Sequence, residues 1–232
     1  MKNDLSKKNV QSLKGFGILL MVMLHLFGFP SWLKEGNSYI PLFKNLNLEY
    51  ILAKFGGICV ALYVFLSGYG MEKTSKKGTN LKRCILKIID LYKIYWVILI
   101  PFIIIGIQYY NLQINSKELL LNLFAIKPSY NVFVWFIRLY IQLLLLFPFI
   151  KKILDLNYKK AFFITITIYL LTIFNSVFFH IFENIKPFRE TFYYELLYSF
   201  GFWQYLFCLG YLFSKYNIFS KIYYYLEMFV VK

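Results

Sequence analysis

The sequence predicts an all-α protein, a polytopic bundle of transmembrane helices with its N-terminus in the cytoplasm. The first observation behind this prediction is composition: of 232 residues, 59% are hydrophobic, 22% are aromatic and only 16% are charged. A soluble domain of this size would carry more charge, so these proportions favour an integral membrane protein. The other two observations are the lengths of the apolar segments and the placement of the basic residues between them.

Apolar segments long enough to cross a bilayer recur along the chain. A spanning helix needs about 20 mostly apolar residues. Six segments meet this requirement, at residues 13–30, 50–71, 85–109, 132–150, 161–182 and 196–213. The stretch IYYYLEMFVV, from residue 222, is too short to cross and predicts at most a partial seventh span. We therefore expect residues 1–232 to form a single integral-membrane domain that is incomplete at its C-terminus.

The basic residues predict the orientation of these spans. The segments on the N-terminal side of the membrane carry sixteen lysines and arginines, and the opposite loops carry six. The positive-inside rule therefore places the N-terminus in the cytoplasm. The net charge of +15 falls in short clusters between apolar runs, which argues against nucleic-acid binding. The three cysteines lack metal-ligand spacing, so no metal site is predicted.

The first span contains two side chains that are costly in hydrocarbon, Lys14 and His25. His25 is eleven positions after Lys14, which corresponds to a rotation about 20° beyond three full helical turns and a rise of roughly 16 Å. Both therefore project from nearly one face, with Lys14 at the cytoplasmic border and His25 in mid-membrane. Lys14 alone is typical of a helix-end anchor. An ionisable His25 at this depth indicates function, and a neutral imidazole suits a general base, although a hydrogen bond to a neighbouring helix stays open as an alternative.

Four stretches resemble, in the same order, motifs of the membrane-bound acyltransferase family 3. They are LKGFGILLMVMLHLF (13–27), ALYVFLSGYGM (61–71), LKRCILKIIDLYKIYWV (81–97) and VWFIRLYIQLLLLFPFI (134–150). The family's first helix carries an Arg or Lys, then ten residues, then a His, as Lys14 and His25 do here. Its enzymes O-acetylate bacterial cell-surface sugars from cytoplasmic acyl-CoA. The resemblance therefore implies an inner-membrane O-acyltransferase with acetyl-CoA as co-substrate and a sugar hydroxyl as acceptor.

The resemblance also implies roles for individual residues. His25 would be catalytic, and the acyl donor would be bound by basic and hydroxyl side chains, namely Lys14, Ser67, Lys82, Arg83 and Lys87. Two alternatives stay open. Ser67-Gly68 could instead be a small-residue helix contact, and the basic loop could reflect topology alone. Arg83 is the best candidate in that loop because its planar guanidinium suits a phosphate.

Several further residues carry specific expectations. Trp135 and Arg138 are assigned to the acceptor sugar or to structure, and Arg138 could pair with a carboxylate or orient the sugar. No acidic residue is plainly placed to neutralise Arg138, although four glutamates are expected near the outer face, Glu49, Glu183, Glu190 and Glu195. Asp90 is predicted to form a local ion pair because Lys87 and Lys93 flank it at a spacing of three. His180 is expected at the membrane interface. The aromatic residues Tyr92, Tyr95 and Trp96 predict an interfacial aromatic belt.

Two departures from the family bear on activity. Members usually exceed three hundred residues with about ten spans, and many carry a histidine before the Trp of the fourth motif, where this chain has Phe133 and Val134. A short or truncated member, or an inactive fragment, therefore stays among the hypotheses. The other alternative is a non-enzymatic transport or scaffold subunit of a polysaccharide export system, in which Lys14, His25 and Arg138 would line a polar path.

Overall fold

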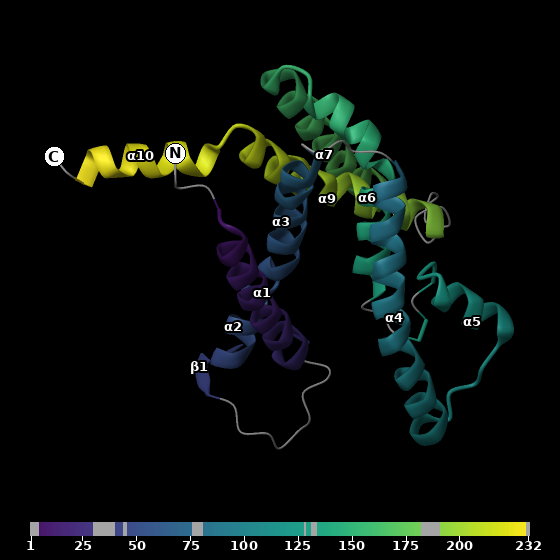
Figure 1. The fold of residues 1–232 in the computed structure, drawn as a ribbon. Helices are drawn as coiled ribbons and strands as arrows, with labels where there is room; N and C mark the ends of the chain where they lie inside the picture. The colour runs from purple at the N-terminus through teal and green to yellow at the C-terminus, as the bar shows by residue number, and fades with distance from the viewer. Residues whose placement is uncertain are drawn as a thin grey trace. The chain divides into compact units, whose positions relative to one another are not determined.

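Helices form nearly all of the regular structure, which confirms the predicted all-α class. A computed structural model describes residues 5–29, 40–43, 46–75, 81–127, 129–130, 134–181 and 191–230. The helices, shown in Figure 1, are α1 (Lys7–Phe27), α2 (Leu48–Gly56), α3 (Ile58–Ser75), α4 (Leu81–Tyr110), α5 (Ser116–Leu123), α6 (Trp135–Leu154), α7 (Tyr158–Ile181), α9 (Phe192–Lys215) and α10 (Ile218–Val230). Two short antiparallel strands, β1 (Pro41–Phe43) and β2 (Leu46–Asn47), precede α2.

Among the residues that the structure describes, five stretches of helix are long and apolar enough to cross a membrane, so the chain is a multi-pass membrane protein. They are Lys7–Phe27, Leu48–Ser75, Leu81–Tyr110, Tyr158–Phe178 and Phe192–Lys215. Their surfaces are apolar: Val97 is 73% exposed and Phe163 is 71% exposed. Side chains of this kind are covered in a bilayer, whereas such a surface in water would mark an interaction site.

The remaining predicted span, 132–150, corresponds to α6, which differs from the other five in charge and burial. Its 20 residues include Arg138, Lys151 and Lys152, whereas the other five stretches each contain an 18-residue window with at most two charged residues. One side of α6 is buried, through Leu139, Leu143, Leu144, Phe147, Ile150 and Leu154. α6 is therefore extensively packed, and two of its charges have protein partners: Arg138 pairs with Glu195 and Lys151 pairs with Asp155. Residues 132 and 133 lie outside the described part of the chain.

The chain divides into two compact units. The first contains residues 1–73 and 206–232, and the second contains residues 74–205. In the first unit α1 packs on α2 and α3, and the end of α9 leads into α10. The second unit contains α4, α5, α6, α7 and the first part of α9, and Figure 1 shows α5 beside the half of α4 that leads to Tyr110.

Glycines permit the close helix contacts of the first unit. A Cβ atom at Gly68 of α3 would lie 1.8 Å from the carbonyl oxygen of Phe207, and one at Gly210 of α9 would lie 2.0 Å from that of Phe65. Both distances are far shorter than any real contact, so only glycine fits at these two positions. α3 and α9 therefore pack backbone against backbone at this crossing, as helices in membranes often do.

Candidate active site

The predicted pair on α1 lies as helical geometry requires. Ser6 begins the helix by accepting a hydrogen bond from the backbone N–H of Asn9 at 3.1 Å, which satisfies one of the free N–H groups of the first turn. The helix then runs unbroken from Lys7 to Phe27. It carries Lys14, which is exposed, and His25, which is half-buried. One continuous helix therefore keeps both residues at the predicted spacing.

α1 runs antiparallel to α2 and α3, which fixes what lies beside each member of the pair. A Cβ atom at Gly17 would lie 3.0 Å from the ring of Tyr63, and one at Gly56 would lie 2.4 Å from the carbonyl oxygen of Leu20. The Lys14 end of α1 thus lies against the middle of α3. The His25 end lies beyond Gly56, towards α2.

At the lysine end, Tyr63 and Ser67 of α3 join Lys14. The Tyr63 hydroxyl donates to the Lys14 carbonyl oxygen at 2.8 Å, and the Ser67 hydroxyl donates to the Tyr63 carbonyl oxygen at 2.7 Å. Ser67 follows Tyr63 by four residues and therefore lies on the same face of α3. The structure thus brings two of the predicted donor-binding residues, Lys14 and Ser67, to one level of the first unit. Gly68, which follows Ser67, makes the small-residue contact between α3 and α9 described above.

At the histidine end, an aromatic ring and a second cation accompany His25. The imidazole stacks on the ring of Phe29 with 6.3 Å between centroids and 8° between planes. The Lys54 ammonium lies 5.9 Å from the centroid of the same Phe29 ring and 5.2 Å from that of Tyr50, a cation–π arrangement. Sequence reasoning missed Lys54, although a lone charge inside the apolar run 50–71 was a signal for it.

A buried carboxylate also escaped the sequence analysis. Glu72, near the end of α3, is only 4% exposed and accepts a 2.5 Å hydrogen bond from the hydroxyl of Ser214 on α9. A buried charge is retained when hydrogen bonds satisfy it. This pair lies in the first unit and fixes the end of α3 to α9, close to the crossing at Gly68.

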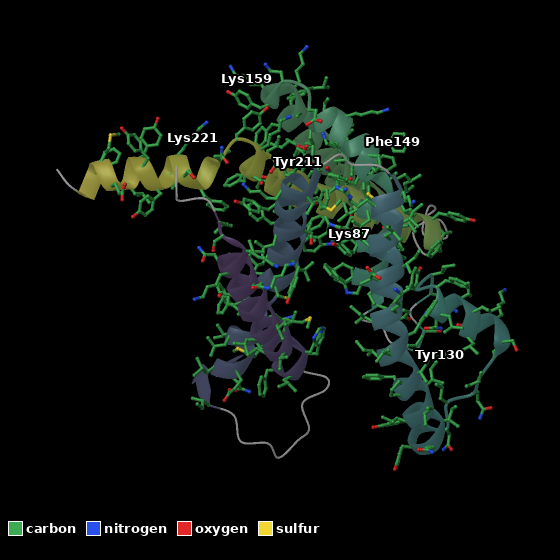
Figure 2. All side chains as sticks on the ribbon, in the orientation of Figure 1. Lys87, Tyr130, Phe149, Lys159, Tyr211 and Lys221 are labelled. Atoms are coloured by element: carbon green, nitrogen blue, oxygen red, sulfur yellow. The ribbon has the colours of Figure 1, made fainter. Side chains whose placement is uncertain are left out.

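The predicted basic cluster is at the start of α4, in the second unit. Lys82 and Arg83 are exposed and Lys87 is half-buried; Figure 2 labels Lys87 on α4. Arg83 donates from Nη1 to the carbonyl oxygen of Thr74 at 3.2 Å, so part of its fork is used by the protein itself. The predicted donor-binding residues are therefore divided between the units, with Lys14 and Ser67 in the first and these three in the second. The predicted local ion pair of Asp90 is present, with Lys93 at 3.0 Å.

Arg138 joins three segments of the second unit. Its Nη2 pairs with the Glu195 carboxylate of α9 at 2.9 Å, its Nη1 donates to the Ile126 carbonyl oxygen at 3.0 Å, and its guanidinium carbon lies 5.3 Å from the centroid of the Phe192 ring. The sequence did not assign a carboxylate to Arg138, and the structure pairs it with Glu195. The Nε atom is buried and has no hydrogen-bond partner among the described residues.

Three further expectations concern residues near this helix. Trp135 lies against Trp203 of α9, with 6.1 Å between ring centroids. Val134, where many family members have a histidine nearby, is buried, and Phe133 lies outside the described residues. The backbone of His180 belongs to α7, but its side chain is outside the described part, so its interfacial position stays a prediction.

The aromatic donors of α4 have a specific task that composition did not reveal. The hydroxyl groups of Tyr95 and Tyr92 and the indole N–H of Trp96 each donate to a backbone carbonyl oxygen at the end of α5. Their acceptors are Asn122 at 2.6 Å, Phe124 at 2.8 Å and Leu123 at 2.9 Å, in that order. Because the last carbonyl groups of a helix have no partner inside it, these three donors cap α5 and hold it on α4.

Comparison with known proteins adds one match. A model of acyltransferase family 3, described as an acyltransferase domain, matches residues 7–229. No curated protein and no solved structure matches the chain significantly.

Proposed function

The chain belongs to acyltransferase family 3, and from this membership we propose that it is an O-acyltransferase of the bacterial inner membrane. It would move an acyl group, in the first instance acetyl, from cytoplasmic acyl-CoA to a hydroxyl of a cell-surface or lipid-linked sugar. Its partners are then the lipid bilayer, the acyl-CoA and the glycan, with no nucleic acid. The observation that carries the proposal is the placement of Lys14 and His25 on one face of a single helix of a multi-pass membrane protein.

The proposed mechanism is general-base catalysis by His25. The imidazole takes the proton of the acceptor hydroxyl, and the hydroxyl oxygen attacks the carbonyl carbon of the thioester. The carbon–sulfur bond then breaks, and the CoA thiolate leaves and takes up a proton. A relay in which His25 is itself acylated first uses the same residue as the nucleophile. In either case a nitrogen of the ring must reach the reacting group.

The surroundings of Lys14 and His25 support different roles for the two ends of α1. Lys14, exposed at one end, is suited to an anionic phosphate of the donor, and Ser67 at the same level offers a hydroxyl. About 16 Å of helix separates Lys14 from His25, which accommodates an extended pantetheine arm. Lys54 brings a positive charge to the histidine end, where the thioester oxygen gains negative charge during attack. Lys82, Arg83 and Lys87 are further candidates for the donor phosphates.

Trp135 and Arg138 are the residues proposed for the acceptor sugar. The ring of Trp135 offers an apolar face for a sugar. The Nε of Arg138, which has no partner among the described residues, offers a donor for a sugar hydroxyl group. The remaining contacts of Arg138 are structural, so this residue would orient the acceptor from a fixed position. A rigidly held side chain is what precise orientation requires.

Acetyl transfer to surface glycan by cells that carry His25→Ala tests the proposal. The variant should lose transfer from labelled acetyl-CoA, whereas His180→Ala, which changes the only other histidine of the chain, should keep it. Both proteins should accumulate in membranes to the same level. Glycan acetylation that is unchanged by His25→Ala would refute the mechanism and favour a non-enzymatic export subunit.

A further inference from the structure

The first unit contains an open pocket at the bend between α9 and α10. Its volume is about 390 Å³, within the range of small-molecule sites, and it is lined by Tyr216, Asn217, Ser220, Lys221, Tyr224 and Tyr225. Asn217 has a φ of 50°, a left-handed conformation that asparagine tolerates and that turns the chain from one helix into the next. Figure 2 shows Lys221 on the first part of α10, next to this bend.

The lining combines three chemical groups that suit one kind of ligand. Three tyrosine rings provide faces on which a planar heterocycle can stack, and the residues Tyr224 and Tyr225 are 59% and 58% exposed. The Asn217 amide and the Ser220 hydroxyl can bond to the edge of a base. The Lys221 ammonium can bind a phosphate. None of the described residues that line the pocket is acidic, and Lys221 gives the lining a positive charge that complements an anionic ligand.

The position of the pocket along α3 relates it to the pair on α1. Phe219, inside the α10 turn that forms the pocket, packs against Phe65 and Tyr69 of α3 at ring-centroid distances of 6.2 and 6.0 Å. These two residues flank Ser67-Gly68. Tyr63, which bonds to the Lys14 carbonyl, precedes Tyr69 by six residues, a rise of about 9 Å. His25 lies in the opposite direction, towards Gly56 and α2.

We propose that this pocket binds the phosphorylated adenosine end of acyl-CoA. The inference depends on the donor in the proposed function and adds the site where the nucleotide is held. The adenine ring lies against the tyrosine rings, and Lys221 holds a phosphate. The rest of the donor then passes Ser67 and Lys14 towards His25.

Binding of defined donor fragments to the purified full chain in nanodiscs tests the inference. By isothermal titration, the wild type should bind CoA, adenosine 3′,5′-bisphosphate and 4′-phosphopantetheine. Lys221→Ala and Tyr224→Ala should each weaken CoA and the bisphosphate by about tenfold, the typical effect of losing a stacking ring or a phosphate contact. Both should leave 4′-phosphopantetheine unchanged, because that fragment lacks adenosine.

Matched variants make the result specific. Tyr223 is on the same helix but does not line the pocket, so Tyr223→Ala should bind CoA as the wild type does. Tyr224→Phe keeps the ring and Lys221→Arg keeps the charge, and both should retain binding. Equal loss in Tyr223→Ala, or full CoA binding in Lys221→Ala and Tyr224→Ala, would overturn the inference and leave the proposed acyl transfer standing. A wild type that binds no CoA would overturn the donor assignment and the inference together.

Discussion

Arg138 and Glu195 form an ion pair of 2.9 Å in which the arginine side chain is 7% exposed and the glutamate side chain is 59% exposed. The two charges therefore differ in how well water can solvate each of them when the pair is broken. Glu195 can be solvated without its partner, whereas Arg138 stays enclosed by the Ile126 carbonyl and the Phe192 ring. A buried charge that loses its counter-charge is destabilising.

The first prediction is that Glu195→Gln lowers the stability of the protein. Because Arg138 keeps one hydrogen bond and its cation–π contact, we expect a loss of about 1–3 kcal/mol, measured by thermal unfolding in detergent. The double variant Arg138→Met with Glu195→Gln should lose less stability than the sum of the losses in the two single variants. Once one partner has been changed, changing the other breaks no further ion pair. The exposed pair Asp90–Lys93 is the control: Asp90→Asn should change stability by less than about 0.5 kcal/mol. Additive effects at Arg138 and Glu195 would show that the pair is not coupled.

The second prediction concerns the crossing of α3 and α9. Gly68→Ala would place a methyl group 1.8 Å from the Phe207 carbonyl oxygen, so the helices must separate. We expect a loss of about 1–3 kcal/mol, as in other overpacked contacts, and a matching decrease in stable protein in membranes. Gly70→Ala is the control in the same helix, because a Cβ atom there meets nothing within 4 Å. Equal behaviour of the two variants would contradict a backbone-to-backbone crossing.

The parts of this structure that follow from local rules were predictable from the sequence. Apolar runs of spanning length predicted the helices, because a bilayer requires every backbone group to be bonded within its own segment. The alignment of Lys14 with His25 needed only the helical repeat. The i,i+3 pair of Asp90 with Lys93 was predictable for the same reason.

The contacts that depend on how helices meet were not predictable in this way. The sequence has four glutamates expected near the outer face and none plainly placed to neutralise Arg138, and the packing of α6 on α9 brings Glu195 to it. Lys54 reaches Phe29 because α2 ends at Gly56, beside α1. The spacing of these residues along the sequence does not predict this contact. Tyr92, Tyr95 and Trp96 have the composition of an interfacial belt, and their role as caps of α5 becomes visible only in three dimensions.

The third prediction follows from these caps. Tyr95→Phe removes the hydroxyl group that donates to the Asn122 carbonyl oxygen at 2.6 Å and leaves that buried acceptor without this donor. The expected cost is about 1 kcal/mol. Hydrogen exchange of the amides in α5 should become faster, while exchange in α1 stays the same. Tyr109→Phe is the matched control because Tyr109 is 76% exposed. Protection of α5 that does not depend on Tyr95 would show that the cap is not what holds this helix.

The fourth prediction is a pH dependence of the segment that follows α5. The Lys127 ammonium and the Ser129 hydroxyl donate to the Glu118 carboxylate at 2.8 and 2.7 Å, and these hydrogen bonds lower its pKa below the ordinary 4.5. A carboxylate with a lowered pKa in the folded state stabilises that state above the ordinary pKa, and the contribution is lost as the pH falls through the lowered value. We therefore expect hydrogen exchange of the amides near Lys127 to accelerate as the pH is lowered from 6 to about 3, once the rates are corrected for intrinsic exchange.

Glu118→Gln separates this effect from general acid unfolding. The amide cannot ionise, so the variant should show the faster exchange near Lys127 already at pH 6 and little further change on acidification. The neighbouring cap of α5 should be unaffected, because Asn115 accepts from the backbone N–H groups of Lys117 and Glu118 whether or not the side chain of residue 118 is charged. If the variant and the wild type show the same pH profile, the Glu118 carboxylate does not hold the segment, and the acid sensitivity must come from another group.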